Sequence, residues 1–149
     1  MPNVFGKWCK PNYNSFIATF CHNILRERPI EIREPDSEVS LVYIDDVCKS
    51  FITTINSKKE EGYLFVDNVY KATVGEVAKQ LAHFKNSRDS LIIENVGTGL
   101  TRALYSTYLS YLEPNNFHYS LTGHEDERGL FCEFLKTKNS GQFSFFTAH

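Results

Sequence analysis

The stretch EVSLVYIDDVCKSFITTINSKK, residues 38–59, sets the fold class of this chain. It begins with an apolar run through Leu41, Val42 and Tyr43, which is typical of a β-strand. It then passes into a helix near Asp45 and Asp46, because carboxylates in a first turn suit the positive end of the helix dipole. Adjacent carboxylates at a helix start point in different directions, which favours this capping role over paired acid/base work.

The segment before this stretch predicts one helix and one short strand. Asn14 or Ser15 can cap a helix, and Pro29 predicts that the helix ends near Arg28. The sequence PIEIRE, residues 29–34, alternates apolar and charged residues and predicts a half-exposed strand. The apolar positions of the helix recur at three- and four-residue spacing at Phe16, Ile17, Phe20, Ile24 and Leu25.

The segment after it predicts a strand and two helices. GYLFVDN, residues 62–68, is a compact apolar run that indicates a strand. Thr73 and Glu76 have the spacing of a capping box at the start of a helix. TRALYSTYLSYL, residues 101–112, indicates an amphipathic helix with Leu104, Tyr108 and Leu112 on one side. The apolar face of the helix that follows Thr73 is expected at Val74, Val77, Leu81 and Phe84.

The pattern changes after EPNNF, residues 113–117. Two alternating apolar runs, LFCEFLK and QFSFFTA, flank a turn signal at Asn139, Ser140 and Gly141. This arrangement predicts a β-hairpin. The sequence therefore divides into an α/β part over residues 1–116 and a β-rich part over residues 117–149.

The composition narrows the class of protein. The 149 residues are 42% hydrophobic and 23% charged with a formal charge of −2, which does not indicate a nucleic-acid partner. An apolar run long enough to span a membrane and a signal peptide are both lacking, so we expect no membrane insertion and a cytoplasmic location. The four cysteines lack CxxC spacing and the five histidines lack metal-ligand spacing, so we expect reduced thiols and assign no metal ligand.

One glycine-containing segment has only part of a dinucleotide motif. In SLIIENVGTGLTRALYS, an apolar run leads through Gly97 and Gly99 into a helix, which is the order that seats a pyrophosphate. Arg102 stands where the third glycine would allow close packing, and no acidic residue follows a second strand at the right distance. A plain loop before a helix is the favoured interpretation.

Three segments resemble a known family in order and separation. PNVFGKW, residues 2–8, resembles the R-x-x-N-V-Y-G-P segment of extended short-chain dehydrogenase/reductases, and LVYIDDV, residues 41–47, resembles their F-V-H-V-D-D-V. YLFVDNVYKATVGEVAKQLA resembles the strand and helix that follow. FGKWCKPNYNS, TGLTRALYSTYLSYL and GHEDERGLFCEFLKTKNSGQFSFF are similar to capsular-polysaccharide reductases that join such a domain to a C-terminal cupin.

This resemblance implies a fold and an activity for full-length members. Residues 1–116 would be the C-terminal, substrate-binding part of an extended short-chain reductase domain, and residues 117–149 the first strands of a cupin domain. Full-length members would use NADPH to reduce a UDP-linked 4-keto-6-deoxy-HexNAc sugar, with C3 epimerisation in a zinc-containing cupin, toward UDP-N-acetyl-L-fucosamine for capsule.

The chain lacks the residues that this chemistry uses. It has no glycine-rich cofactor fingerprint, no Tyr-x-x-x-Lys pair and no histidine-rich cupin strand. We therefore expect an internal fragment that is inactive alone, with no catalytic residue and with neither NADP(H) nor zinc bound. UDP-sugar binding is expected to be weak or lost.

The resemblance also indicates the site residues. Asn3 matches a substrate-contacting asparagine beside the nicotinamide, which places Pro2 and Asn3 near the cofactor; the alternative for Asn3 is an amide that holds its own turn. Asn12, Tyr13 and Asn14 suit a pyrophosphate or sugar hydroxyls, although Asn14 also suits a helix cap. Lys7 and Lys10 could face phosphate or simply be solvated.

Two other functions remain open. The chain could be a UDP-sugar-binding remnant, or a structural domain that self-associates. The apolar strands around Leu41, Val42, Leu64 and Phe65 are of the kind that a larger parallel sheet buries on both faces. Without neighbouring strands their edges are open, and open strand edges pair with other copies of the same chain. We therefore expect a homo-oligomer.

Overall fold

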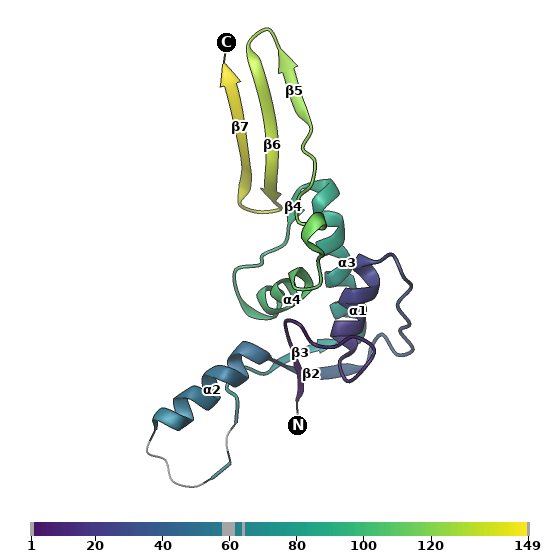
Figure 1. Ribbon diagram of the computed structural model, residues 1–149, viewed down its shortest axis with the longest axis vertical. Helices are drawn as coiled ribbons and strands as arrows, with labels where there is room; N and C mark the ends of the chain where they lie inside the picture. The colour runs from purple at the N-terminus through teal and green to yellow at the C-terminus, as the bar shows by residue number, and fades with distance from the viewer. Residues whose placement is uncertain (1, 58–61, 64, 149) are drawn as a thin grey trace.

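The computed structural model describes residues 2–57, 62–63 and 65–148, and it confirms a mixed α/β part followed by a β-rich part (Figure 1). The strands are β1 (Asn3–Phe5), β2 (Glu38–Tyr43), β3 (Tyr70–Thr73), β4 (Ile92–Ile93), β5 (Gly123–Asp126), β6 (Gly129–Thr137) and β7 (Gly141–Ala148). The helices are α1 (Phe16–Leu25), α2 (Ile44–Asn56), α3 (Val74–Ser90) and α4 (Gly99–Leu109), with a short 3-10 helix over Pro114–Asn116.

The first sheet has the strand order β1-β2-β3. β1 and β2 are parallel, with Asn3 opposite Leu41 and Phe5 opposite Tyr43. β3 is antiparallel to β2, with Thr73 opposite Glu38. The parallel pair thus joins two segments that are far apart in the chain.

The core lies between this sheet and three helices. Phe5, Leu41 and Tyr43 from the strands are at most 1% exposed. α4 contributes Leu104 and Tyr108 as expected, whereas Leu112 lies beyond the end of the helix and is half-buried. The other buried core residues from the helices are Ile17, Phe20, Cys21, Val77, Ala78, Leu81, Phe84 and Ala103.

Two of these helices, α1 and α3, begin at residues whose side chains cap the first turn. Of the two candidates for α1, Ser15 is the cap, because its Oγ accepts a hydrogen bond from the Ala18 N–H at 3.3 Å. The capping box of α3 is confirmed. The Glu76 N–H donates to Thr73 Oγ1 at 3.1 Å, and the Thr73 N–H donates to Glu76 Oε2 at 2.7 Å.

Helix α1 ends at Leu25, three residues before the expected position at Arg28. Glu27 takes a left-handed backbone conformation with φ of 55°, and the Arg28 N–H donates to the Asn23 carbonyl at 2.9 Å. The Asn23 side-chain amide donates to the Pro29 carbonyl at 3.2 Å. The N–H groups of this turn bond to carbonyls in the last turn of the helix, so the helix ends early.

Two of the predicted strands are wrong for the described residues. Residues 29–34 form no strand; instead the side chains of Ile30 and Ile32 are half-buried against the core. Residues 62–63 and 65–68 form no strand either, while Leu64 lies outside the described residues. A strand needs a neighbour for its backbone hydrogen bonds, and neither segment is paired with a described strand.

The second sheet is built around β6. The predicted hairpin is confirmed, since β7 pairs antiparallel with β6 along its length, and β5 pairs with the start of β6. β4 pairs parallel with the end of β6, Ile93 opposite Thr137. Because β4 follows α3 directly, the α/β part supplies a strand to the β-rich sheet.

Arg88 holds the connection between the two parts. Its guanidinium donates to the carbonyls of Asn116 at 2.5 Å and Phe117 at 3.2 Å, and lies 5.8 Å from the ring of Tyr119. A guanidinium presents several donors in one plane, so a single side chain can bind successive carbonyls. The linker from α4 to β5 is thereby fixed against α3.

The buried hydroxyl of Tyr108 makes the stability of the fold depend on alkaline pH. The side chain is 1% exposed, and its oxygen has no hydrogen-bond partner among the described residues. Burial raises the pKa of Tyr108 to about 12. Because the folded pKa is raised, its contribution to stability is fully present below about pH 10, the pKa of an unfolded tyrosine, and is lost as the pH rises through the folded value.

We expect Tyr108→Phe to leave the free energy of unfolding at pH 7 unchanged or to raise it by about 1 kcal/mol, because the variant removes an unpaired buried hydroxyl. Its stability should also decline less steeply above pH 10. Urea unfolding at several pH values measures both effects, with the exposed Tyr13→Phe as the control. A loss of stability at pH 7 would show that the Tyr108 hydroxyl is hydrogen-bonded.

Candidate functional site

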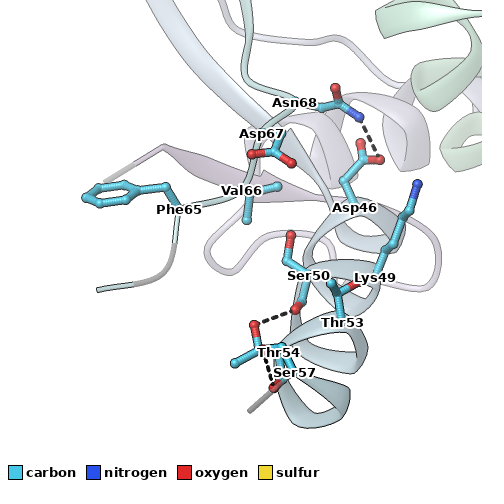
Figure 2. A pocket seen from close by; sticks show the side chains of 10 residues that line it. All are labelled: Asp46, Lys49, Ser50, Thr53, Thr54, Ser57, Phe65, Val66, Asp67 and Asn68. Carbon is cyan, nitrogen blue, oxygen red and sulfur yellow. Dashed lines mark hydrogen bonds between the residues drawn. The ribbon is translucent and has the colours of Figure 1, made fainter. Parts of the chain in front are cut away.

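The carboxyl ends of β1 and β2 lie side by side, which is where ligands bind in parallel α/β sheets. Lys7 follows β1, and its Nζ lies 3.0 Å from Asp45 Oδ2 at the start of α2. Asp46 accepts a hydrogen bond from Asn68 Nδ2 at 3.1 Å (Figure 2) and another from the Tyr70 hydroxyl at 3.5 Å. The two adjacent carboxylates therefore have different partners, as the sequence predicts.

Two cations lie near the ring of Tyr43 at the end of β2. Lys7 Nζ is 5.8 Å and Arg102 Cζ is 5.7 Å from the ring centroid. The hydrogen bond with Asp45 holds the pKa of Lys7 above its usual value. Lys7 thus forms an ion pair within the protein, which leaves Arg102 as the cation without a carboxylate partner among the described residues.

The loop from Gly6 to Ser15 is held by the helices on either side. Trp8 and Asn12 take left-handed backbone conformations, with φ of 59° and 56°. The Asn12 N–H donates to Thr19 Oγ1 at 2.9 Å, and Thr19 Oγ1 donates to the Ser15 carbonyl at 3.1 Å. These bonds fix the far end of the loop to the first turn of α1.

The near end of this loop is fixed to the end of α4. The Trp8 N–H donates to Ser110 Oγ at 3.2 Å, and the Tyr111 hydroxyl donates to the Cys9 carbonyl. Burial raises the pKa of Tyr111, so this phenol is a neutral donor at physiological pH. Both ends of the loop are thus positioned before any ligand arrives.

An open hollow of about 920 Å³ lies along this loop. Three predicted site residues line it, namely Asn12, Tyr13 and Asn14. All three side chains are exposed, and Tyr13 is 73% exposed. The rest of the lining comes from the first turns of α1 and from the turn after it, at Ser15, Phe16, Thr19, Phe20, Asn23, Pro29, Ile30 and Glu31.

The other predicted residues lie at different distances from this hollow. Lys10 Nζ is 5.8 Å from the ring centroid of Tyr13, so Lys10 borders the hollow. Asn3 is exposed at the start of β1 and Pro2 precedes it, and neither lines the hollow. The Asn3 side chain forms no hydrogen bond to a described residue. The structure therefore brings together residues 10–14 and leaves Pro2 and Asn3 apart from them.

Comparison with known proteins shows which proteins this chain resembles. No family model matches the chain. Over 150 aligned residues the chain is 56% identical to UDP-2-acetamido-2,6-beta-L-arabino-hexul-4-ose reductase of Pseudomonas aeruginosa, covering 100% of this chain and 40% of that protein. The crystal structure of the capsular polysaccharide assembling protein CapF from Staphylococcus aureus matches with a TM-score of 0.91 and 43% identity, over 99% of this chain and 40% of that chain.

The chain resembles a fragment of CapF. It spans about two fifths of the length of these relatives. UDP-glucose 4-epimerase of Thermus thermophilus, solved in complex with NAD, is 16% identical with a TM-score of 0.56 over 73% of this chain, which shows the fold alone. The fold class expected from the sequence, part of a reductase-type α/β domain followed by β-strands, agrees with both likenesses.

Sequence reasoning missed the residues that position the loop from Gly6 to Ser15. Thr19, Ser110 and Tyr111 hold its backbone, and the last two are about a hundred positions away in the chain. Thr19 had a local signal, because a threonine in the first turn of a helix can accept a hydrogen bond from the preceding loop. No local pattern connects Ser110 or Tyr111 with this loop.

The described residues contain neither a metal-binding cluster nor a helix that could span a membrane. Within residues 2–57, 62–63 and 65–148, no three His, Cys, Asp or Glu side chains gather closely enough to hold a metal ion. In the same residues, no helix combines the length and the apolar character needed to cross a membrane. All four cysteines are free thiols.

Thr19→Val tests whether its hydroxyl holds the loop. The variant keeps the shape of the side chain and removes the acceptor of the Asn12 N–H. We expect a loss of about 1 kcal/mol in stability and faster hydrogen exchange in residues 12–14. Thr54→Val is the matched control, because Thr54 Oγ1 donates to the Ser50 carbonyl within α2 at 2.9 Å and touches no loop. Unchanged exchange in Thr19→Val would contradict the role of this hydroxyl.

Proposed function

We propose that this chain forms one side of the sugar-nucleotide-binding site of a CapF-like reductase. It binds a UDP-linked 2-acetamido sugar without reducing it. The observation that carries this proposal is the 56% identity along the whole chain to a protein named as a UDP-2-acetamido-2,6-beta-L-arabino-hexul-4-ose reductase. The sugar-nucleotide biosynthetic role is supported further by the likeness to CapF. The substrate belongs to the same class as the one in the name of the relative.

The loop supplies groups suited to this substrate. Asn12 and Asn14 offer amide donors and acceptors for sugar hydroxyls, and Tyr13 offers an exposed ring and a phenol. Lys10 places a positive charge beside Tyr13, where a diphosphate would gain a charge-assisted contact. Because the loop backbone is already held by Thr19 and Tyr111, little ordering is needed on binding.

The described residues do not fit a dinucleotide. Gly97 precedes α4 and Gly99 is its first residue, but Arg102 stands where the motif requires a third glycine, followed by the fully buried Ala103. Reduction of a keto group also needs a proton donor at its oxygen, and the sequence has no Tyr-x-x-x-Lys pair. We therefore assign NADP(H) binding and hydride transfer to the longer relatives and not to this chain.

We assign the domains in the same way. Residues 1–116 correspond to the substrate-binding part of a reductase domain, and residues 117–149 to the first strands of a cupin. Zinc binding and C3 epimerisation require a complete cupin. The role of this chain would be to hold the sugar nucleotide. Pro2 and Asn3 would border the nicotinamide only when a cofactor-binding unit is present.

Self-association is the second candidate function, favoured by one observation. β7 is the outer strand of its sheet and every one of its residues is exposed, including Phe143, Phe145 and Phe146. A long edge strand with apolar side chains pairs readily with another copy. A homo-oligomer formed through β7 would leave the loop at residues 10–14 open to ligand.

Titration calorimetry with UDP and with UDP-N-acetylglucosamine tests the proposed function. We expect weak binding, and at least tenfold weaker binding in Asn12→Gly and in Tyr13→Ala. Glycine tolerates the left-handed conformation of Asn12, so that variant removes the amide while keeping the loop. Tyr63→Ala, which changes an exposed tyrosine outside the hollow, is the matched control.

Two outcomes would contradict the proposal. An absence of binding heat at millimolar sugar nucleotide would show that the loop does not bind this ligand. Oxidation of NADPH by this chain in the presence of a UDP-4-keto sugar would show that it carries catalytic groups of its own.

A further inference from the structure

Trp8 is the only tryptophan of the chain, and it lies in the loop that follows β1. Its side chain is 80% exposed, in contrast to that of Phe5 at the end of β1, which is 1% exposed. Single exposed apolar side chains are common on protein surfaces, so exposure alone assigns no role to Trp8. Two further features, its backbone conformation and its neighbours, set Trp8 apart.

The backbone of Trp8 is held in a conformation that a bulky residue rarely adopts. Its φ of 59° lies in the left-handed region, where the Cβ of an L residue crowds the following carbonyl oxygen. The Trp8 N–H donates to Ser110 Oγ at 3.2 Å, and Ser110 Oγ donates to the Thr107 carbonyl at 2.7 Å. The Tyr111 hydroxyl donates to the next carbonyl, that of Cys9. Contacts with the end of α4 thus impose this conformation, and residues held in such strain cluster at ligand sites.

Trp8 is the outermost member of a series of aromatic rings and cations. Lys7 Nζ is 5.7 Å from the centroid of the Trp8 ring and 5.8 Å from that of the Tyr43 ring. Arg102 Cζ is 5.7 Å from the Tyr43 centroid. Cations at such distances are attracted to the ring faces. The series follows the carboxyl ends of β1 and β2, and Trp8 is its most exposed side chain.

Along the chain, Trp8 stands between the end of β1 and the hollow of the proposed binding site. Phe5 ends β1, Lys10 borders the hollow through its contact with Tyr13, and residues 12–14 line it. Trp8 is not among the lining residues. A ligand that occupies the hollow and extends past Lys10 toward the strand ends therefore meets the exposed indole.

A sugar nucleotide has the length and the order of parts for this path. Its base and ribose, its diphosphate and its hexose follow one another. Ligands of open α/β sheets bind outside the carboxyl ends of the strands, and the relative is named as a reductase of a hexulose. The hexose is therefore the part expected at the strand ends. With the diphosphate at Lys10, the base and the ribose lie along the hollow.

The exposed indole matches one face of a hexose. A pyranose ring carries C–H groups on its faces and hydroxyls around its edge, whereas tryptophan has a broad apolar face and a single N–H donor. Stacking removes apolar area of both rings from water and leaves the sugar hydroxyls free for hydrogen bonds at the edge. Because the backbone of Trp8 is already fixed, little further ordering accompanies this contact.

We propose that the indole of Trp8 is the surface against which the hexose of the sugar nucleotide stacks, and that this contact distinguishes a UDP-sugar from UDP. The identity of the ligand rests on the proposed function. UDP has no hexose, so it binds at Lys10 and the hollow without covering Trp8. Trp8 is thus a specificity-determining residue of the site.

Tryptophan fluorescence tests this contact directly, because all tryptophan emission of the chain comes from Trp8. The chain is titrated with UDP-N-acetylglucosamine and with UDP, with excitation at the long-wavelength edge of tryptophan absorption, where uracil does not absorb. We expect a saturable blue shift with the UDP-sugar, because the hexose displaces water from the indole. UDP should leave the emission maximum unchanged. Titration of N-acetyltryptophanamide with both ligands is the control for absorption by the ligand.

Substitution of Trp8 separates the sugar from the nucleotide in calorimetry. Trp8→Ala should weaken binding of UDP-N-acetylglucosamine at least fivefold and change binding of UDP less than twofold, because it removes the ring and leaves Lys10 and the hollow in place. Unchanged binding of UDP also shows that the loop is intact. Trp8→Tyr keeps an aromatic face and should recover most of the lost affinity. Tyr63→Ala, at a side chain that is 94% exposed outside the hollow, is the matched control.

Three results would overturn this inference alone. The first is binding of the UDP-sugar in calorimetry without a change in Trp8 emission. The second is an equal emission shift with UDP, which would assign the indole to the base. The third is equal weakening of both ligands in Trp8→Ala. An absence of heat with both ligands in the unchanged chain would instead overturn the proposed function, and this inference with it.

Discussion

The parallel pairing of β1 with β2 is the constraint on which the rest of the structure depends. It brings residues 3–5 beside residues 41–43, and no local hydrogen bonding along the chain could do this. The pair buries Phe5, Leu41 and Tyr43 in the core that α1, α3 and α4 complete. Burial of these large side chains provides the main driving force that offsets closing the intervening loop.

The same pairing positions the proposed substrate site. The loop that leaves β1 must return to the start of α1, and the bonds of Thr19, Ser110 and Tyr111 shape it into a hollow lined by Asn12, Tyr13 and Asn14. The helix that leaves β2, α2, has no buried residue, and its Phe51, Ile52 and Ile55 are exposed. The proposed substrate site thus begins at the end of β1, beside the strand that leads into α2.

Features encoded by neighbouring residues could be predicted from the sequence. The capping box of Thr73 and Glu76 and the hairpin around Gly141 depend on contacts within a few positions or between adjacent strands. The strands predicted at 29–34 and, for the described residues, at 62–63 and 65–68 are wrong because a strand depends on a distant neighbour.

The candidate site was predictable in part for the same reason. Residue type and resemblance predict Lys10, Asn12, Tyr13 and Asn14 as site residues; the last three line one hollow, and Lys10 lies beside Tyr13. Their anchors on α4 were not found, because a contact across a hundred positions leaves no local pattern.

Hydrogen exchange of the isolated chain tests the central constraint most directly. The inward amides of β1 and β2, at residues 3–5 and 41–43, should be among the slowest to exchange and should exchange together, because opening one strand exposes the other. Exchange of β1 at the rate of the loop over residues 29–36, with β2 still protected, would contradict a fold built on this pair.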